Sequence, residues 1–288
     1  MTAPESFVVV IVTRGRPDNV KTYRYLREFG YTGPIMLVID DEDASGDRYR
    51  ELYGDEVVTF HRNVGSEDFD TADIENRPTV IHARNAVPGL VAERGYRYHL
   101  VLDDDSHSVG HRDVAADGRF IARSTRRLDD VFQMFLDFLD TTGALTVAMA
   151  QGGDYIGGPD GAFRRRLLRK AMNSFFTRTD RPIGFVGRVN EDTNTYVVKG
   201  NRGELFFTFT AFYLAQAWTQ TSEGGMTDEY LHSGTYVKSF YSVMMCPSAV
   251  KIAVMGNKEM RIHHLVHWRN AVPQIVSEQY RRLDKGAA

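Results

Sequence analysis

The feature that most limits the fold is a short apolar stretch ending in three consecutive carboxylates, YHLVLDDDSHS over Tyr98–Ser108. Its β-branched, aliphatic and aromatic residues predict a buried strand. Three adjacent like charges at the end of such a strand repel one another and are costly to desolvate. A divalent cation relieves that repulsion, and carboxylate oxygens are ligands that Mg²⁺ and Mn²⁺ prefer. An ordinary acidic turn is the alternative, so the rest of the chain has to decide between the two.

The composition is that of a globular protein with a sizeable core. The 288 residues are 42% hydrophobic and 25% charged, values that are ordinary for a folded domain. A net charge of −3 provides no general attraction to nucleic acid or to a membrane. The single cysteine, Cys246, excludes an internal disulfide and fits a reducing compartment. Because we find no signal peptide and no apolar run of membrane-spanning length, we expect a cytoplasmic protein.

Two further apolar runs, Phe7–Val12 and Pro34–Ile39, have the unbroken pattern of strands buried on both faces of a parallel sheet. A shorter strand is predicted at 57–61. Helical segments are predicted at 18–29 and 78–94, and we expect Pro88 to bend or interrupt the second. This order of elements predicts an α/β fold with a mostly parallel central sheet flanked by helices.

Polar clusters follow three of the predicted strands, at Thr13–Arg16, Asp40–Asp43 and Asp103–Asp105. Sheets of this class bind ligands outside the carboxyl ends of their strands. We therefore expect the three clusters to form one site. No G-x-G-x-x-G motif and no Walker P-loop follows the first strand, which disfavours a dinucleotide-binding site and a P-loop nucleotide site.

The second half of the chain predicts a helix at 128–139, a strand at 145–150 and an aromatic core strand at 205–212. The segment 151–161 is too rich in glycine for regular structure and is expected to be a mobile loop. Next to it lies the densest basic cluster of the chain, which contains Arg164, Arg165, Arg166, Arg169 and Lys170. This cluster is either a solvated helix face or a local phosphate-binding surface.

Three histidines lie near the end of the chain, in MRIHHLVHW at 260–268. On a strand, His263 and His264 would face opposite ways, so only one could readily reach a metal ion. On a helix, His267 would share a face with His264. Histidines of this kind are structural or metal-ligating, and the pattern leaves both readings open.

The motifs together resemble a known enzyme family. LDDD after a strand is similar to the metal-binding D-x-D motif of glycosyltransferases with the GT-A fold. The closer resemblance is to the phage TET-associated glycosyltransferases, which attach sugars to hydroxymethylated pyrimidines in DNA, such as 5-hydroxymethylcytosine. The segments that carry it, in the family's order, are Thr13–Pro17 (TRGRP), Ala83–Asn85 (ARN), Leu102–Ser106 (LDDDS), Arg188–Tyr196 (RVNEDTNTY), Gly224–Gly225 and Arg261–His264 (R-x-H-H).

The resemblance implies a nucleotide-sugar donor, a UDP-sugar, and a divalent metal, Mn²⁺ or Mg²⁺. The implied donor-binding residues are Thr13, Arg14, Gly15, Arg16, Asp40, Arg84, Asn85, Asp103 and Asp104. Arginine forks among them match the oxygens of a diphosphate. The implied metal ligands are Asp103, Asp105 and His264, with His263 as the second choice for the distal position. The metal would neutralise the leaving diphosphate as a Lewis acid.

The resemblance also implies a catalytic base. In an inverting reaction of this hexosyltransferase type, the acceptor hydroxyl loses its proton as it attacks the anomeric carbon, and a nearby carboxylate accepts that proton. The family's N-E-D matches Asn190–Asp192, which implies Asp192 as the base and Glu191 as the second choice. Acidic residues beside a helix dipole are the alternative explanation, and in a retaining reaction Asp192 would lose this role. Asn194 departs from the family pattern, which has an aspartate there, so the choice of acceptor or sugar can differ.

The expected organisation is one continuous domain with two halves. Residues 1–110 would bind the nucleotide sugar, and residues 111–288 would bind the acceptor and complete the metal site. In the second half, Arg164, Arg165, Arg166 and Arg169 would contact DNA. A hydroxymethyl group on a base is accessible from the major groove or after base flipping. A phage origin would place the protein in the cytoplasm of the host cell.

Three other functions stay open. A GT-A glycosyltransferase with a sugar, lipid or protein acceptor agrees with the acidic net charge but not with the basic cluster. A sugar nucleotidyltransferase predicts a glycine-rich loop after the first strand, which TRGRP matches only loosely. A module that binds without catalysis would not need the full set of carboxylates and histidines. The identity of the sugar and the oligomeric state have no transferable sequence code.

Overall fold

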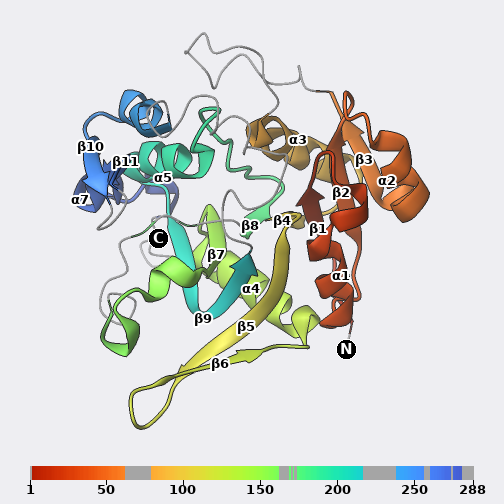
Figure 1. Cartoon of the computed structure of the whole chain (residues 1–288), viewed down its shortest axis with the longest axis horizontal. Helices are drawn as coiled ribbons and strands as arrows, with labels where there is room; N and C mark the ends of the chain where they lie inside the picture. The colour runs from red at the N-terminus through yellow and green to blue at the C-terminus, as the bar shows by residue number, and fades with distance from the viewer. Residues whose placement is uncertain are drawn as a thin grey trace, which may run out of the picture.

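The computed structural model describes residues 2–61, 79–161, 169, 171, 174–216, 238–255, 260–273 and 275–280. Its centre is a nine-stranded sheet in the order β3-β2-β1-β4-β8-β7-β9-β5-β6 (Figure 1). The first four strands are mutually parallel: β3 (Val57–Phe60), β2 (Ile35–Asp40), β1 (Phe7–Val12) and β4 (Tyr98–Asp103). The α/β class is thereby confirmed, and the predicted N-terminal strands agree with the observed ones to within one residue at each end.

Beyond β4 the sheet is mixed. It continues with β8 (Phe175–Arg178), β7 (Thr146–Ala150), β9 (Phe206–Gln216), β5 (Ser106–Val114) and β6 (Phe120–Ser124). Of these neighbours only β7 and β9 run parallel to each other. The β5–β6 hairpin extends away from the body of the molecule (Figure 1). Parallel pairing is therefore concentrated in the half that precedes the triple aspartate.

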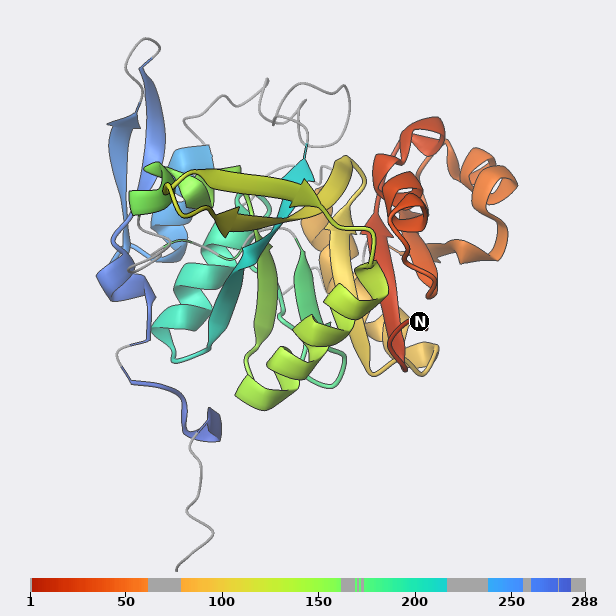
Figure 2. The same ribbon diagram turned by 90° about the horizontal axis from the view of Figure 1, so that it is seen from below.

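β1 shows why the parallel strands lack an apolar–polar alternation. Its residues point alternately into two hydrophobic cores, Phe7, Val9 and Ile11 into one and Val8, Val10 and Val12 into the other. The first core is covered by α1 (Lys21–Glu28), α2 (Gly46–Tyr53) and α4 (Leu128–Thr142), and the second by α3 (Val80–Glu93). Figure 2 shows α4 lying across its face of the sheet. A strand between two helical layers has to be apolar throughout.

The two long helices follow from their sequences in different ways. α4 carries a stripe of buried residues at helical spacing, Leu128, Val131, Phe132, Phe135, Leu136 and Leu139, and it ends where Gly143 adopts a left-handed conformation (φ 63°). α3 runs unbroken through Pro88, so the expected interruption does not occur. Proline removes one backbone hydrogen bond, and here the packing of Ala83, Val87 and Val91 against the sheet outweighs that loss.

Three further segments differ from expectation. The glycine-rich stretch at 151–161 contains two short 3-10 helices, Gly152–Tyr155 and Gly158–Asp160, and the first is closed by reciprocal hydrogen bonds between Gln151 and Asp154. The aromatic strand β9 is half-buried rather than a core strand. The strand β8, which follows the basic cluster, was not predicted, and its Phe176 is fully buried. These outcomes depend on partners that local sequence does not reveal.

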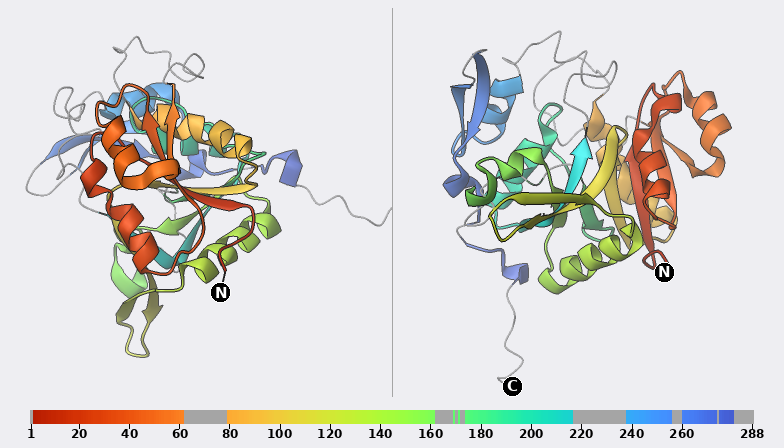
Figure 3. Two further views of the ribbon diagram at one scale, coloured as in Figure 1. Left: turned by 90° about the vertical axis from the view of Figure 1, so that its right-hand side faces the viewer. Right: turned by 60° about the horizontal axis from the view of Figure 1, so that its bottom comes forward.

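The remaining elements lie on the side of the molecule away from β1–β3 (Figure 3). They are α5 (Glu191–Asn201), a helix at 238–245, the antiparallel pair β10 (Val250–Met255) and β11 (Arg261–Val266), and the short α7 (Trp268–Ala271). Val197 of α5 shares a small core with Val250 and Ala271. No helix in the described part of the chain is long and apolar enough to cross a membrane.

Candidate active site

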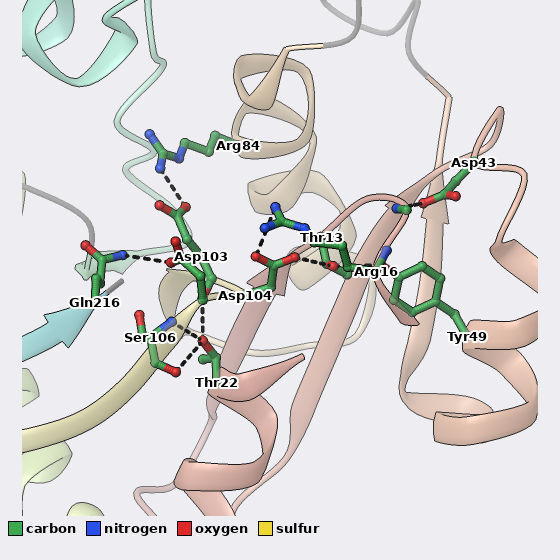
Figure 4. Close-up of polar contacts among 12 residues, drawn as sticks. Thr13, Arg16, Thr22, Asp43, Tyr49, Arg84, Asp103, Asp104, Ser106 and Gln216 are labelled. Carbon is green, nitrogen blue, oxygen red and sulfur yellow. Dashed lines mark hydrogen bonds and ion pairs between the residues drawn. The ribbon is translucent and has the colours of Figure 1, made fainter. Parts of the chain in front are cut away.

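The carboxyl ends of β2, β1 and β4 meet at one edge of the sheet, and side chains from their loops are connected there (Figure 4). Thr13 Oγ1 donates to Asp104 Oδ2 over 2.7 Å, and the Arg16 guanidinium lies 3.2 Å from Asp104 Oδ1. Tyr49 of α2 joins them, since its hydroxyl lies 2.8 Å from Thr13 Oγ1 and accepts from the Arg16 backbone N–H over 2.9 Å. The predicted convergence of the strand-end clusters therefore exists in the structure.

The three aspartates do not have equal surroundings. Asp104 is buried and directed toward the β1 loop, whereas Asp103 lies on the side of Arg84 and Gln216 (Figure 4). Asp105 is also on that side, because Gln216 Nε2 is 3.5 Å from Asp105 Oδ1. Asp104 is thus held by the β1 loop, whereas Asp103 and Asp105 face the side of Arg84 and Gln216.

Burial and mutual repulsion make this turn electrostatically unfavourable by itself. Burial, with the charges of Asp103 and Asp104, raises the pKa of Asp105 to about 6. Burial also raises the pKa of Asp104, although Arg16 and the Thr13 hydroxyl oppose that shift. A carboxylate whose charge is disfavoured by other carboxylates gains from a nearby cation. The turn therefore has the charge excess and the oxygen ligands that suit Mg²⁺ or Mn²⁺.

Thr22, the second residue of α1, holds the backbone of the triple-aspartate turn. Its hydroxyl donates to the Asp103 carbonyl over 2.6 Å and accepts from the Ser106 N–H over 3.0 Å, and its own N–H donates to the Asp104 carbonyl over 3.2 Å. A threonine at the start of a helix is not by itself a recognisable sequence motif. Neither Thr22 nor Tyr49 nor Gln216 was predicted from the sequence, because their roles appear only when distant segments meet.

Arg84 connects the triple aspartate to α5. This buried guanidinium donates to Asp103 Oδ1 over 2.8 Å and to Glu191 Oε1 at short range. Although burial by itself lowers the pKa of Arg84, the charges of Asp103 and Glu191 raise it, so the side chain stays cationic. Burial raises the pKa of Glu191, and the adjacent guanidinium opposes that shift. One cation therefore compensates two carboxylates from different parts of the fold.

The two acidic residues at the start of α5 have distinct positions. Glu191 is 7% exposed and directed at Arg84, whereas Asp192 is only partly buried. Asp192 Oδ1 accepts from the Thr193 N–H over 2.6 Å. Asn190, which precedes them, has a positive φ of 56° and donates through Nδ2 to the Lys238 carbonyl and to Ser242 Oγ. The turn before α5 is thereby fixed to the helix at 238–245.

The other residues predicted to bind the donor are hydrogen-bonded to neighbouring residues of the protein. Arg14 donates to Asp40 Oδ2 over 2.5 Å, and the Gly15 N–H donates to Asp43 Oδ2 over 2.8 Å. Gly15 has a φ of 68°, a conformation open to glycine at little energetic cost. A small hollow of about 210 Å³ beside these residues is lined by Asp40 and other residues of the β2 end and α2. Whether these residues bind a donor stays a prediction.

Two asparagines hold backbone in place. Asn85 accepts from the Phe185 N–H over 2.8 Å and donates to the Phe185 carbonyl over 3.0 Å, which fixes the chain before α5. Asn194, where an aspartate was expected, is fully buried and donates to the Val189 carbonyl over 2.8 Å. A carboxylate cannot donate that hydrogen bond, so the departure at Asn194 has a structural explanation.

The histidines lie on β11, but not as expected. The rings of His263 and His264 have centroids 4.2 Å apart and are tilted by 34°, so they lie side by side instead of facing opposite ways. His264 Nδ1 lies 3.3 Å from Asn190 Nδ2. His267 follows the strand rather than occupying a helix.

The predicted metal ligands are only partly assembled. Among the residues that the structure describes, no three His, Cys, Asp or Glu side chains form a group that could hold a metal ion. Asp103, Asp105 and His264 are all described, so the structure does not bring them together as a ready-made site. Of the four predicted acceptor-binding arginines, Arg164, Arg165 and Arg166 lie outside the described residues, as do Gly224 and Gly225, and Arg169 lies 3.2 Å from Asp154 Oδ1 through its Nε.

Comparison with solved structures finds similar proteins at low sequence identity. One is glucosyl-3-phosphoglycerate synthase from Mycobacterium tuberculosis in complex with Mn²⁺, UDP and phosphoglyceric acid, with 10% identity and a TM-score of 0.48 over 93% of this chain and 88% of that chain. Another is TarS 1-349 from S. aureus, with 12% identity and a TM-score of 0.41 over 75% and 60% of the two chains. A third is UDP-glucose pyrophosphorylase from Leishmania major, with 16% identity and a TM-score of 0.26 over 51% and 36%.

Sequence comparison gives a more specific result. No curated protein matches the chain. The family model of the TET-Associated Glycosyltransferases matches residues 7–225, a span that contains β1, the triple aspartate, Arg84 and the start of α5. Because this match covers well over half of the 288 residues, the protein belongs to the TET-associated glycosyltransferase family and is a glycosyltransferase.

Proposed function

We propose that this enzyme transfers a sugar from a UDP-sugar to a hydroxymethylated pyrimidine in DNA, with a divalent metal and with inversion at the anomeric carbon. The observation that carries the proposal is the network at the strand ends, in which Arg84 joins Asp103 to the Glu191-Asp192 pair. It brings a cation-demanding turn and a candidate base to the same region of the molecule. Family membership supports the choice of a modified base in DNA as the acceptor.

Asp103 and Asp105 would hold the metal. The protein offers two carboxylates there, and substrate phosphates and water commonly complete the shell of such an ion. When bound, the metal would act as a Lewis acid for the departing diphosphate. His264 stays the candidate for a further ligand, and its participation would require β11 to approach the β4 end. Asp104 would act indirectly, because it fixes Thr13 and Arg16 at the donor loop.

Asp192 is the better candidate for the base. The attacking hydroxyl forms a bond to the anomeric carbon, the bond from that carbon to the diphosphate oxygen breaks, and the hydroxyl proton passes to a carboxylate. Glu191 is buried and its carboxylate is paired with the Arg84 guanidinium inside the protein, so it is poorly placed to contact an acceptor hydroxyl. Asp192 is partly exposed and lies one residue away on the first turn of α5. We therefore assign proton acceptance to Asp192 and a positioning role, through Arg84, to Glu191.

The experiment that tests this function measures UDP release and product mass together. The enzyme would be incubated with a panel of UDP-sugars, Mn²⁺ and DNA that contains 5-hydroxymethylcytosine, and the DNA would be digested to nucleosides for mass spectrometry. We expect a hexose-sized mass gain on the modified nucleoside. We expect Asp192→Asn to lower kcat by about 10²–10⁴-fold, the usual contribution of a general base, with the KM of the donor unchanged.

Asp130→Asn is the matched control, since Asp130 is also a first-turn aspartate but belongs to α4. Release of UDP without any mass gain would contradict the DNA acceptor and retain the donor. A normal kcat in Asp192→Asn would rule out Asp192 as the base. Full activity after exhaustive chelation of divalent ions would rule out the metal.

A further inference from the structure

A second cavity, of mixed polar and apolar lining, lies between α5, the helix at 238–245 and β11. Its volume is about 330 Å³, which is within the range of small-ligand sites. Arg169, Asn190, Lys238, His263 and His264 are among its lining residues, and Trp268 forms part of its wall. These residues come from four separate segments, so no motif in the sequence indicates their proximity.

The charge of this cavity is opposite to that of the protein. Two of its lining residues, Arg169 and Lys238, carry a fixed positive charge, that of Arg169 partly compensated by Asp154, and two are histidines. None of the described lining residues is acidic, although the whole chain has a net charge of −3. A basic concavity on an acidic protein concentrates anions locally. Phosphate is an anion that such donors bind through charge-assisted hydrogen bonds.

Several of its walls are held in place by other residues. Asn190 donates to the Lys238 carbonyl over 2.7 Å and lies 3.3 Å from His264 Nδ1. Arg169 is oriented by Asp154, whose Oδ1 is 3.2 Å from its Nε. Preorganised donors of this kind lose little conformational freedom when a ligand binds. The cavity therefore has the properties of a binding site rather than of a gap between elements.

The position of the cavity favours the acceptor over the nucleotide of the donor as its ligand. Every described residue that lines it belongs to the second half of the chain, and none comes from the ends of β1, β2 or β4. Asn190 also lies two residues before Asp192, the candidate base. A ligand in the cavity would thus sit beside the start of α5, close to the candidate base.

From these observations we infer that the cavity binds a phosphodiester of the acceptor DNA strand and so positions the modified nucleotide at Asp192. The inference rests on the DNA acceptor of the proposed function and adds the residues that would recognise its backbone. A phosphate contact fixes the register of a strand without reading its sequence. The site would therefore contribute to affinity and positioning for any sequence around the modified base.

The test measures DNA binding separately from sugar transfer. Anisotropy of a labelled oligonucleotide that contains 5-hydroxymethylcytosine would give the Kd at several salt concentrations. We expect Lys238→Met to raise the Kd about tenfold and to reduce the slope of log Kd against log salt by about one, as for the loss of one phosphate contact. Lys238→Arg should restore most of both. Lys251→Met is the matched control, because Lys251 is an exposed lysine on the neighbouring strand β10 that does not line the cavity.

Each outcome decides the inference. Melting curves would first show that the variants are folded. Lys238→Arg would then show whether DNA binding depends on the positive charge at this position. A Kd and salt slope equal to those of the wild type in Lys238→Met would overturn the inference, and so would an effect confined to the KM of the UDP-sugar, since the phosphate would then belong to the donor. DNA binding that depends on Lys238 without any sugar transfer would support the cavity as a phosphate site and refute the proposed transfer reaction.

Discussion

Arg84 is the residue that links the parts of the site most directly. It lies in the middle of α3, yet its guanidinium contacts the end of β4 and the first residue of α5. The rings of Phe175 and Phe185 lie about 5.5 Å from the guanidinium carbon and enclose it. Because the guanidinium is enclosed, water cannot replace the two carboxylates as its hydrogen-bond partner. Its removal therefore affects stability as well as the geometry of the site.

We expect Arg84→Met to destabilise the protein by about 3–5 kcal/mol, because it leaves buried Glu191 without its counter-charge. Urea unfolding followed by circular dichroism would measure the difference. Arg94→Met at the end of the same helix, an exposed position, should cost less than about 1 kcal/mol. Equal effects of the two substitutions would show that the Arg84 ion pairs contribute no more than a surface arginine.

Substitution of Asp105 is expected to stabilise the protein, in contrast to substitution of Arg84. Its pKa is about 6 in the folded protein against an ordinary value of 3.8, so the folded state binds the proton more tightly and loses stability as pH rises from about 4 to 6. Without metal, Asp105→Asn should therefore raise the stability at pH 8 by roughly 1 kcal/mol, after allowance for partial exposure, and the Tm by roughly 2–4 °C. At pH 4 the two proteins should melt alike.

Addition of Mn²⁺ should make the wild type melt at a higher temperature than Asp105→Asn at pH 8. A bound cation stabilises the wild type, whereas the variant lacks one of the ligands for that cation. Asp55→Asn, at an exposed position, controls for the charge change. If the melting temperature of Asp105→Asn rises with Mn²⁺ as much as that of the wild type, Asp105 is not a metal ligand.

At the scale of the element, β4 combines structural and functional demands. Its interior residues Leu100 and Leu102 are fully buried, and its last residue, Asp103, reaches the site. The same strand contains His99, which is 2% exposed and whose Nδ1 lies 3.2 Å from Thr179 Oγ1. Burial lowers the pKa of His99 to about 4. A strand that carries a neutral histidine inside the sheet makes the fold sensitive to acid.

The sign of this effect follows from linkage. The folded chain resists protonation of His99 until about pH 4, whereas the unfolded chain takes up the proton near pH 6.5, so stability is complete above pH 6.5 and falls as the pH is lowered toward 4. The full loss is on the order of 3 kcal/mol. We expect His99→Gln to remove that part of the pH dependence in melting curves between pH 4 and 7.5. His267→Gln, an exposed histidine, should leave the wild-type profile; an unchanged profile in His99→Gln would refute the assignment.

At the scale of the whole molecule, one sheet unites the two halves expected from the sequence. β4 belongs to the first half and pairs with β1 along one edge. Along its other edge it pairs with β8 of the second half, with Tyr98 opposite Arg178 and Val101 opposite Phe175. α4 of the second half also covers the first core, where Phe132 meets Phe7 with ring centroids 5.9 Å apart. The first half alone would expose an apolar strand edge and an uncovered sheet face.

We therefore expect a fragment of residues 1–110 to lack a cooperative unfolding transition of its own, and the full chain to unfold in a single calorimetric transition. Urea titration of the fragment and scanning calorimetry of the full chain would test this. Two resolved transitions in the full chain, the lower or higher matching that of an independently folded fragment, would show that the halves are separate domains.

The sequence alone determined the parallel half of the sheet and the position of the triple aspartate. Unbroken apolar runs such as Phe7–Val12 can be satisfied only between two covering layers, and charged residues can follow them only where the strands end, so local pattern was sufficient. The amphipathic stripe of α4 was sufficient for the same reason. Family motifs added Arg84 and the Glu191-Asp192 pair as candidates.

Only the tertiary structure decided which partners hold those candidates. Asp104 is held by Thr13 and Arg16, and Glu191 by Arg84, because strand order and helix packing bring together residues up to 107 positions apart. The same holds for Thr22, for the close approach of the two histidine rings on β11 and for the cavity beside α5, none of which local sequence indicates. Side chains that depend on long-range partners carry no periodicity of their own, and their contacts are fixed only when the chain folds.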